Sequence, residues 1–249
     1  MRKKVPFRAV LRSEWTKLRS VRATWWCTAL YLVVVGGVGW LVAAGTDKAP
    51  DAGAAISSAL TGFGVGQLVL VVLGVLAVTA EFSSGTALAS MTAVPRRTRL
   101  LAAKTLVVAA WCALLTVLLV VVCGLAAQTR TAVPGGMSLL DPDVLRPLGL
   151  QVGAAALTGV LAVGLGTVLR STAGAVGAGM ALVMLLPPVL TMSGGWWQIR
   201  ISQALPALRI GEHTFLSAAT PWQVGTAVIG AWAVGAWLLG AVLLERRDV

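Results

Sequence analysis

The sequence predicts an all-α, polytopic membrane protein with six transmembrane helices, and three observations lead to that prediction. Of the 249 residues, 57% are hydrophobic and only 12% are charged, whereas soluble domains carry about 25% charged residues. Six uncharged runs are long enough to cross the roughly 30 Å apolar core of a bilayer. Basic residues gather in alternate connections between these runs, which is typical of membrane topology.

The segment ahead of the first span predicts an N-terminal interfacial amphipathic helix. Its apolar residues recur at spacings of three and four, and arginines fill much of the opposite face. We expect it to lie at the cytoplasmic interface of the bilayer, with Trp15 at the boundary; a solvated basic arm is the alternative. Glu14 interrupts the apolar stripe, so we expect it to face protein and pair with a basic side chain. The assigned residues are Phe7, Leu11, Glu14, Trp15, Lys17 and Leu18.

The six predicted spans follow this helix. They cover residues 24–44, 60–80, 105–127, 148–169, 173–192 and 224–244. Pro187 and Pro188 in the fifth run each remove a helix hydrogen bond, so we expect a kinked or shortened helix there. The chain thus divides into an interfacial segment, residues 1–23, and a transmembrane domain, residues 24–249.

The distribution of Lys and Arg predicts the orientation of the spans. With the N-terminus in the cytoplasm, the inner segments hold 15 of the 20 basic residues and the outer segments hold five. The positive-inside rule favours this arrangement, and an even number of spans returns the C-terminus to the same side. Abundant Ala, Val, Gly and Arg favour a bacterial source. We therefore expect a multi-pass protein of the bacterial cytoplasmic membrane with both termini in the cytoplasm.

The inner connection between the second and third spans, residues 81–104, is the second element outside the membrane. Its serines can cap a short helix whose apolar face includes Leu88 and Met91. Pro95 ends that helix ahead of a cluster of arginines. A short helix at the cytoplasmic surface suits docking to a partner protein, and an ordinary polar connector is the alternative.

Several classes of function are excluded or disfavoured. His213 is the only histidine and the three cysteines lie inside apolar runs, so neither a multi-histidine metal site nor a disulfide framework is indicated. The net charge of +11 lies mainly beside the spans, which argues against a nucleic-acid partner. No carboxylate or lysine lies at mid-membrane, which disfavours an ion-coupled transporter. The sequence has no phosphate-binding loop motif, so any ATPase must be another chain.

Four stretches of the chain resemble the membrane subunits of type-2 ABC transporters, a family of six-span permeases. They are SEWTKLRSVRATWW from residue 13, EFSSGT from residue 81, PRRTRLLAAK from residue 95 and ERRD from residue 245. The resemblance extends over essentially the whole chain. It implies a non-catalytic half-transporter that pairs with a second permease subunit, identical or related. ATP and magnesium would bind to separate cytoplasmic ATPase subunits, and this chain would hold no cofactor.

The resemblance also implies roles for individual residues. Residues 84–93 would form the coupling helix that docks in a groove of the ATPase, and residues 194–222 would cap the path outside. The residues implied in ATPase coupling are Glu81, Ser84, Gly85, Thr86, Leu88, Met91, Pro95 and Arg97. The second and fifth spans line the export path in that family, which makes Gln67 and Thr79 candidate path-lining residues. An interhelical hydrogen bond is the commoner role for a lone Gln in a span.

Two functions from different classes remain open at this point. The first is a permease that exports a hydrophobic or amphiphilic cargo, such as a drug, an antibiotic, a peptide or a lipid-like molecule. The alternative is a non-transporting six-span membrane partner that uses an ABC ATPase for signalling or gating. ATP-dependent movement of cargo in vesicles separates them.

Overall fold

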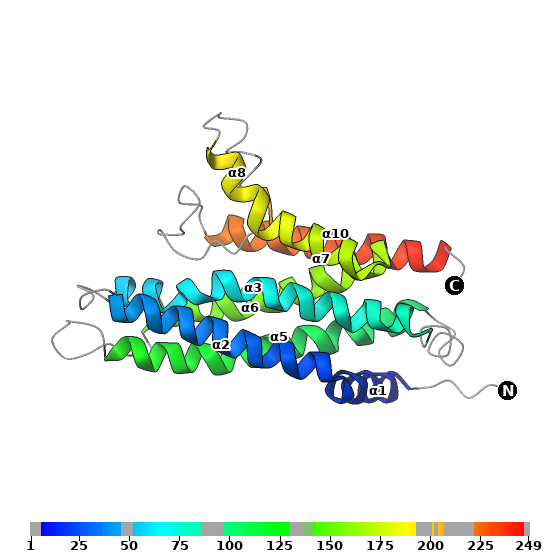
Figure 1. The fold of residues 1–249 in the computed structure, drawn as a ribbon, viewed down its shortest axis with the longest axis horizontal. Coiled ribbons are helices and arrows are strands. Elements are labelled where there is room, and N and C mark those ends of the chain that lie inside the picture. Colours follow the sequence, from blue (N-terminus) through cyan, green and yellow to red (C-terminus); the bar gives the residue numbers. More distant parts are fainter. Residues whose placement is uncertain are drawn as a thin grey trace.

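The computed structural model is an elongated bundle of helices (Figure 1), and all of its described regular structure is helical. It describes residues 6–45, 52–85, 97–129, 138, 141–192, 201, 204–206 and 222–246. The helices are α1 (Phe7–Ser20), α2 (Arg22–Gly45), α3 (Ala52–Ser83), α5 (Arg97–Gln128), α6 (Pro142–Leu169), α7 (Thr172–Met180), the π-helical turn η1 (Ala181–Leu185), α8 (Leu186–Met192) and α10 (Trp222–Arg246).

Six stretches of helix within the described ranges are long and apolar enough to cross a bilayer, which confirms the predicted all-α, six-span fold. Several helices extend beyond the apolar runs. α3 begins at Ala52, eight residues ahead of the predicted span, and α5 begins at Arg97 rather than at residue 105. The added residues of α5 include arginine and lysine, which are good helix formers, and those of α3 are rich in alanine, so both helices continue past the apolar boundary.

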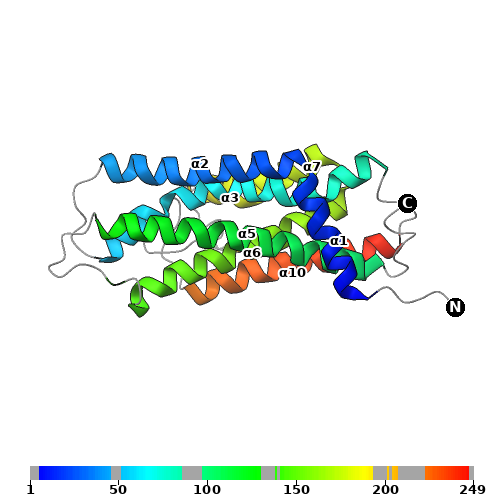
Figure 2. The ribbon, with the colours of Figure 1, turned by 90° about the horizontal axis from the view of Figure 1, so that it is seen from below.

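The spans lie alongside one another, with α3 packed against α2, α5, α6 and α7. The start of α1 and the end of α10 lie at one end of the bundle, together with the end of α3 and the start of α5 (Figure 1). α1 crosses this end at a steep angle to the spans (Figure 2). One extended residue, Val21, separates α1 from α2, so the two helices take independent directions.

The fifth span is kinked, as the two prolines predict. It runs from α7 through the π-helical turn η1 into α8, which contains Pro187 and Pro188. A π-helical turn shifts the backbone hydrogen bonds by one residue, and proline supplies no backbone donor to the regular ladder. The helix continues to Met192, so it is not shortened, and α8 leans away from the rest of the bundle (Figure 1).

α2 and α3 approach each other closely at Gly62. A Cβ atom at this position would collide with the backbone carbonyl of Val35 on α2. Gly64, two residues along the same helix, is exposed within the protomer and has no atom within 4 Å of an added Cβ. Only the first glycine is therefore required by helix packing.

Gly62→Ala is expected to destabilise the protein by about 1–3 kcal/mol, because a backbone carbonyl cannot rotate out of the way as a side chain can. Gly64→Ala is the matched control. It is expected to leave stability unchanged or to raise it slightly, because alanine is the better helix former. Thermal unfolding of both purified variants in detergent measures the difference, and equal melting temperatures would contradict the packing.

Candidate functional site: a charge cluster at one end of the bundle

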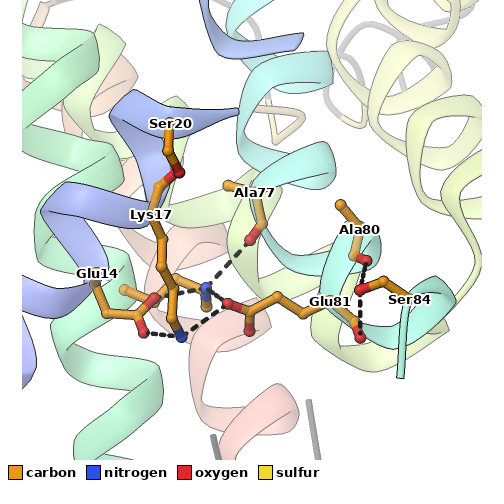
Figure 3. A network of polar contacts seen from close by, with 8 residues as sticks. Glu14, Lys17, Ser20, Ala77, Ala80, Glu81 and Ser84 are labelled. Carbon is orange, nitrogen blue, oxygen red and sulfur yellow. Dashed lines mark hydrogen bonds and ion pairs between the residues drawn. The ribbon is translucent and has the colours of Figure 1, made fainter. Parts of the chain in front are cut away.

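Four charged side chains from three helices meet at the end of the bundle where α3 ends and α5 begins, and Figure 3 labels three of them, Glu14, Lys17 and Glu81. Lys104 Nζ on α5 lies 2.7 Å from Glu14 Oε2 on α1 and 2.9 Å from Glu81 Oε1 on α3. Lys17 Nζ, also on α1, lies 2.7 Å from Glu14 Oε1 and 3.1 Å from Glu81 Oε1. Each lysine therefore bridges both carboxylates. We call these four residues the charge cluster.

The four side chains of the charge cluster differ in how much of each is exposed to solvent. The exposed fraction of the side chain is 2% for Glu14, 10% for Lys104, 18% for Glu81 and 38% for Lys17. A buried ion is stable only when it is paired and hydrogen-bonded. Each oxygen of Glu14 receives one lysine, and the four formal charges cancel, so the cluster meets that requirement.

The two residues of α1 that belong to the charge cluster, Glu14 and Lys17, stay charged at neutral pH. Burial on its own would raise the pKa of Glu14, but the attraction and hydrogen bonds of Lys104 and Lys17 outweigh it, and the pKa lies below the ordinary 4.5. Burial would lower the pKa of Lys17, but Glu14 and Glu81 outweigh that effect and hold the pKa above 10.5. Glu14 and Lys17 therefore stay an ion pair over a wide pH range.

The predicted amphipathic helix forms as α1, and its buried face turns toward α5. Val10, Glu14 and Leu18 recur every fourth residue and are the buried positions of this helix. Val10 packs with Leu100 and Ala103 of α5. The expectation that Glu14 faces protein and pairs with basic side chains is thus confirmed.

Other residues assigned to the interfacial helix take different positions. Trp15 packs edge-on against Trp111 of α5, with ring centroids 5.4 Å apart, and Leu11 packs against the core. Phe7 is exposed. Contact of this helix with lipid stays a prediction.

The two described ends of the connection between α3 and α5 are both fixed to other helices. On the α3 side, Glu81 belongs to the charge cluster, and Lys104 also donates to the carbonyl of Ala77 at 3.2 Å. Ser84 donates to the carbonyl of Ala80 at 2.7 Å, so its hydroxyl serves the end of α3. On the α5 side, Arg97 donates to the carbonyl of Leu244 near the end of α10, at 2.9 Å. Carbonyls at helix ends lack intrahelical donors, which makes this contact favourable.

Comparison with known families gives a match to the family of ABC-2 family transporter proteins over residues 10–192. This chain belongs to the ABC-2 transporter family. The match begins within α1 and ends at α8, so it includes the charge cluster and five of the six spans. Comparison with curated proteins gives no match. As an ABC-2 membrane component the chain is a multi-pass permease whose family implies a separate ATPase.

We call residues 81–97 the coupling segment, and part of it lies outside the described residues. The coupling residues outside the description are Thr86, Leu88, Met91 and Pro95. Most of the expected outer segment, residues 194–222, also lies outside the described residues. Gly85 is described, and its φ of +71° is the left-handed conformation in which glycine commonly ends a helix. The structure therefore locates both ends of the coupling segment and not its middle.

The candidate path-lining residues of the ABC-2 permease are buried within the protomer. Gln67 is 2% exposed and donates to the hydroxyl of Thr158 on α6 at 3.0 Å. Thr79 is 1% exposed and accepts from the hydroxyl of Thr172 at the start of α7, at 2.9 Å. Both contacts hold α3 to neighbouring spans, which is the commoner role of polar side chains in membranes. Lining of a path stays a prediction.

A cavity of about 90 Å³ lies beside the charge cluster, between α1, α2, α3 and α5. The four charged residues line part of it, and most of the remaining wall is apolar, including Cys27, Leu76 and Val107. Apolar surroundings reduce the screening of ion pairs compared with bulk water. Sequence reasoning placed Glu81 at the coupling segment but missed Lys104, because only its position in the fold distinguishes it from the other basic residues of the connection, residues 81–104.

Lys104→Met is expected to cost about 3–5 kcal/mol of stability, because it leaves Glu14 buried without its main partner. Lys17 is more than a third exposed, so Lys17→Met is the matched control and is expected to cost about 1 kcal/mol or less. Chemical or thermal unfolding of the two purified variants gives the comparison. A larger loss for Lys17→Met would show that burial does not rank these pairs.

The stability that Glu14 contributes is expected to depend on pH. Because folding lowers the pKa of Glu14 below 4.5, its contribution is fully present above pH 4.5 and is lost as the pH falls through the lowered value. The melting temperatures of the wild type and of Glu14→Gln should therefore differ at pH 7 and converge in more acidic buffer. Glu245→Gln, an exposed carboxylate at the same end of the bundle, is the control. A difference that stays constant from pH 7 to below pH 4 would argue against the ion pairs.

Proposed function

We propose that this protein is the permease subunit of an ATP-driven exporter of the ABC-2 family, moving a hydrophobic or amphiphilic cargo out of the cell. Two such subunits, identical or related, pair with two cytoplasmic ATPase subunits. The segment from Glu81 to Arg97 receives the ATPase, and α3 and α5 carry its motion into the membrane.

The observation that carries this proposal is the attachment of both ends of the coupling segment. Glu81 is bound to α1 and α5 through the charge cluster, and Arg97 is bound to the end of α10. A displacement of this segment therefore acts on four helices at once, α1, α3, α5 and α10. Helices move as nearly rigid bodies in such transitions, so displacement at one end is passed along the span.

The charges favour a cytoplasmic location for this end of the bundle. Arg8, Arg12 and Arg19 are exposed on α1, and Arg99 is exposed near the start of α5. Clusters of basic residues are retained on the cytoplasmic side of a membrane. The coupling segment then faces the compartment that supplies ATP.

The character of the spans supports a hydrophobic or amphiphilic cargo. Among the described residues, ionisable Asp, Glu, Lys and Arg side chains lie at the ends of the spans rather than in their middles. Ion-coupled transporters carry such groups at mid-membrane. α3 and α7, the second and fifth spans, pack against each other, so a path beside them would be lined mainly by apolar side chains.

Purification of the tagged protein in mild detergent from its own membranes is expected to bring a cytoplasmic ATPase with it in near-stoichiometric amount. Replacing residues 84–93 with a Gly/Ser linker should abolish this association while membrane insertion persists.

Glu81→Ala should abolish ATP-dependent cargo movement in vesicles, whereas Glu245→Ala, exposed at the same end, should not. Repeated recovery of the folded protein without an ATPase would contradict the proposal. Association with an ATPase but no ATP-dependent movement would favour the signalling or gating partner.

A further inference from the structure

The charge cluster gives α1 a role beyond that of an interfacial helix. We propose that Glu14 is a positioning residue for ATPase coupling. Through Lys104 it fixes the spacing between the end of α3 and the start of α5, and thereby the spacing between the two ends of the coupling segment. α1 then stabilises the spacing between the two ends of the coupling segment. The inference rests on the proposed function, because it concerns the same segment.

The first step is the direct link between α3 and α5. Lys104 on α5 donates to the carbonyl of Ala77 at 3.2 Å and pairs with Glu81 at 2.9 Å, so it contacts α3 twice within about one turn. These contacts lie close to where α3 ends and where α5 begins. The position of the Lys104 ammonium therefore sets how far apart the ends of the coupling segment stand.

The second step is what holds Lys104 in place. Glu81 uses one oxygen, Oε1, for both lysines, and its side chain is 18% exposed. Glu14 gives Lys104 its shortest ion pair, 2.7 Å, from the most buried carboxylate of the cluster. Without the charge of Glu14, two ammonium groups would share a single oxygen of Glu81 and repel each other. Lys104 would then turn toward water, and its contacts with α3 would weaken.

The third step is that α1 belongs with α5 rather than with α2. The face of α1 that carries Glu14 also packs on α5 through Val10 and Leu100, and Trp15 packs on Trp111 of the same helix. Val21 is extended and interrupts the helix between α1 and α2. α1 packs more extensively on α5 than on α2, so it is expected to follow the start of α5 when the coupling segment moves.

The spacing itself can be measured without the ATPase. Nitroxide labels at Ser83→Cys and Arg99→Cys, both exposed, report the distance between the ends of α3 and α5 by pulsed electron paramagnetic resonance in a background with the three native cysteines replaced by Ala. Glu14→Gln is expected to broaden and lengthen the distance distribution. Arg12→Gln, an exposed charge on the same helix, is the control and should leave it unchanged. An unchanged distribution in Glu14→Gln would overturn the proposal.

The coupling role is measured as cargo moved per ATP hydrolysed by the full complex in vesicles. Glu14→Gln is expected to lower this ratio about tenfold, within the usual range of coupling between sites, and Glu14→Asp should restore part of it by restoring the charge. Glu14→Asp also keeps the test decisive if Glu14→Gln fails to fold. A normal ratio in Glu14→Gln, despite a changed distance, would overturn the coupling role. If the wild-type protein recruits no ATPase, the proposed function fails and the coupling role fails with it. The distance measurement still shows whether Glu14 fixes the spacing between the ends of α3 and α5.

Discussion

The carboxylate of Glu14 is the constraint around which this end of the molecule is organised. A charge with only 2% of its side chain exposed requires partners on more than one side, and they come from two helices. Lys17 is supplied by the next turn of α1, and Lys104 is supplied by α5. Glu81 on α3 then balances the second positive charge. Satisfying one buried acid thus draws together three helices that are far apart in sequence.

The end of α3 also connects the charge cluster with the start of the fifth span. Its last turns face the charge cluster through Glu81, and they also contact the turn between α6 and α7. The guanidinium of Arg170 lies 5.3 Å from the centre of the Phe82 ring, and Thr172 donates to Thr79. Arg170 has a φ of 51°, a conformation unusual for a residue with a side chain. The end of α3 is therefore the meeting point of the segment between α3 and α5, α1 and the fifth span.

The spans could be predicted from the sequence because the cost of placing charge in hydrocarbon is a local property of each run. The position of Glu14 in an apolar stripe likewise predicted that it faces protein. Its main partner could not be predicted, since Lys104 reaches it only through the packing of α1 on α5. The helix ends at Ala52 and Arg97 were also missed, because hydropathy reports the bilayer boundary and not the end of the backbone hydrogen bonds. Pro187 and Pro188 predicted the kink but not its π-helical form.

The charge cluster lies at the end of the spans rather than in their middles, and this location bears on the proposed coupling. A fully buried network would hold the helices firmly, but separating its ions would leave each charge in a medium that cannot solvate it. Here exposure increases from Glu14 to Lys17, so the outermost ammonium is already partly hydrated. The outer pairs can exchange with water at low cost, while the inner pair keeps α1 on α5. Such a graded network is compatible with the proposed coupling, which requires the helices to stay attached while their positions change.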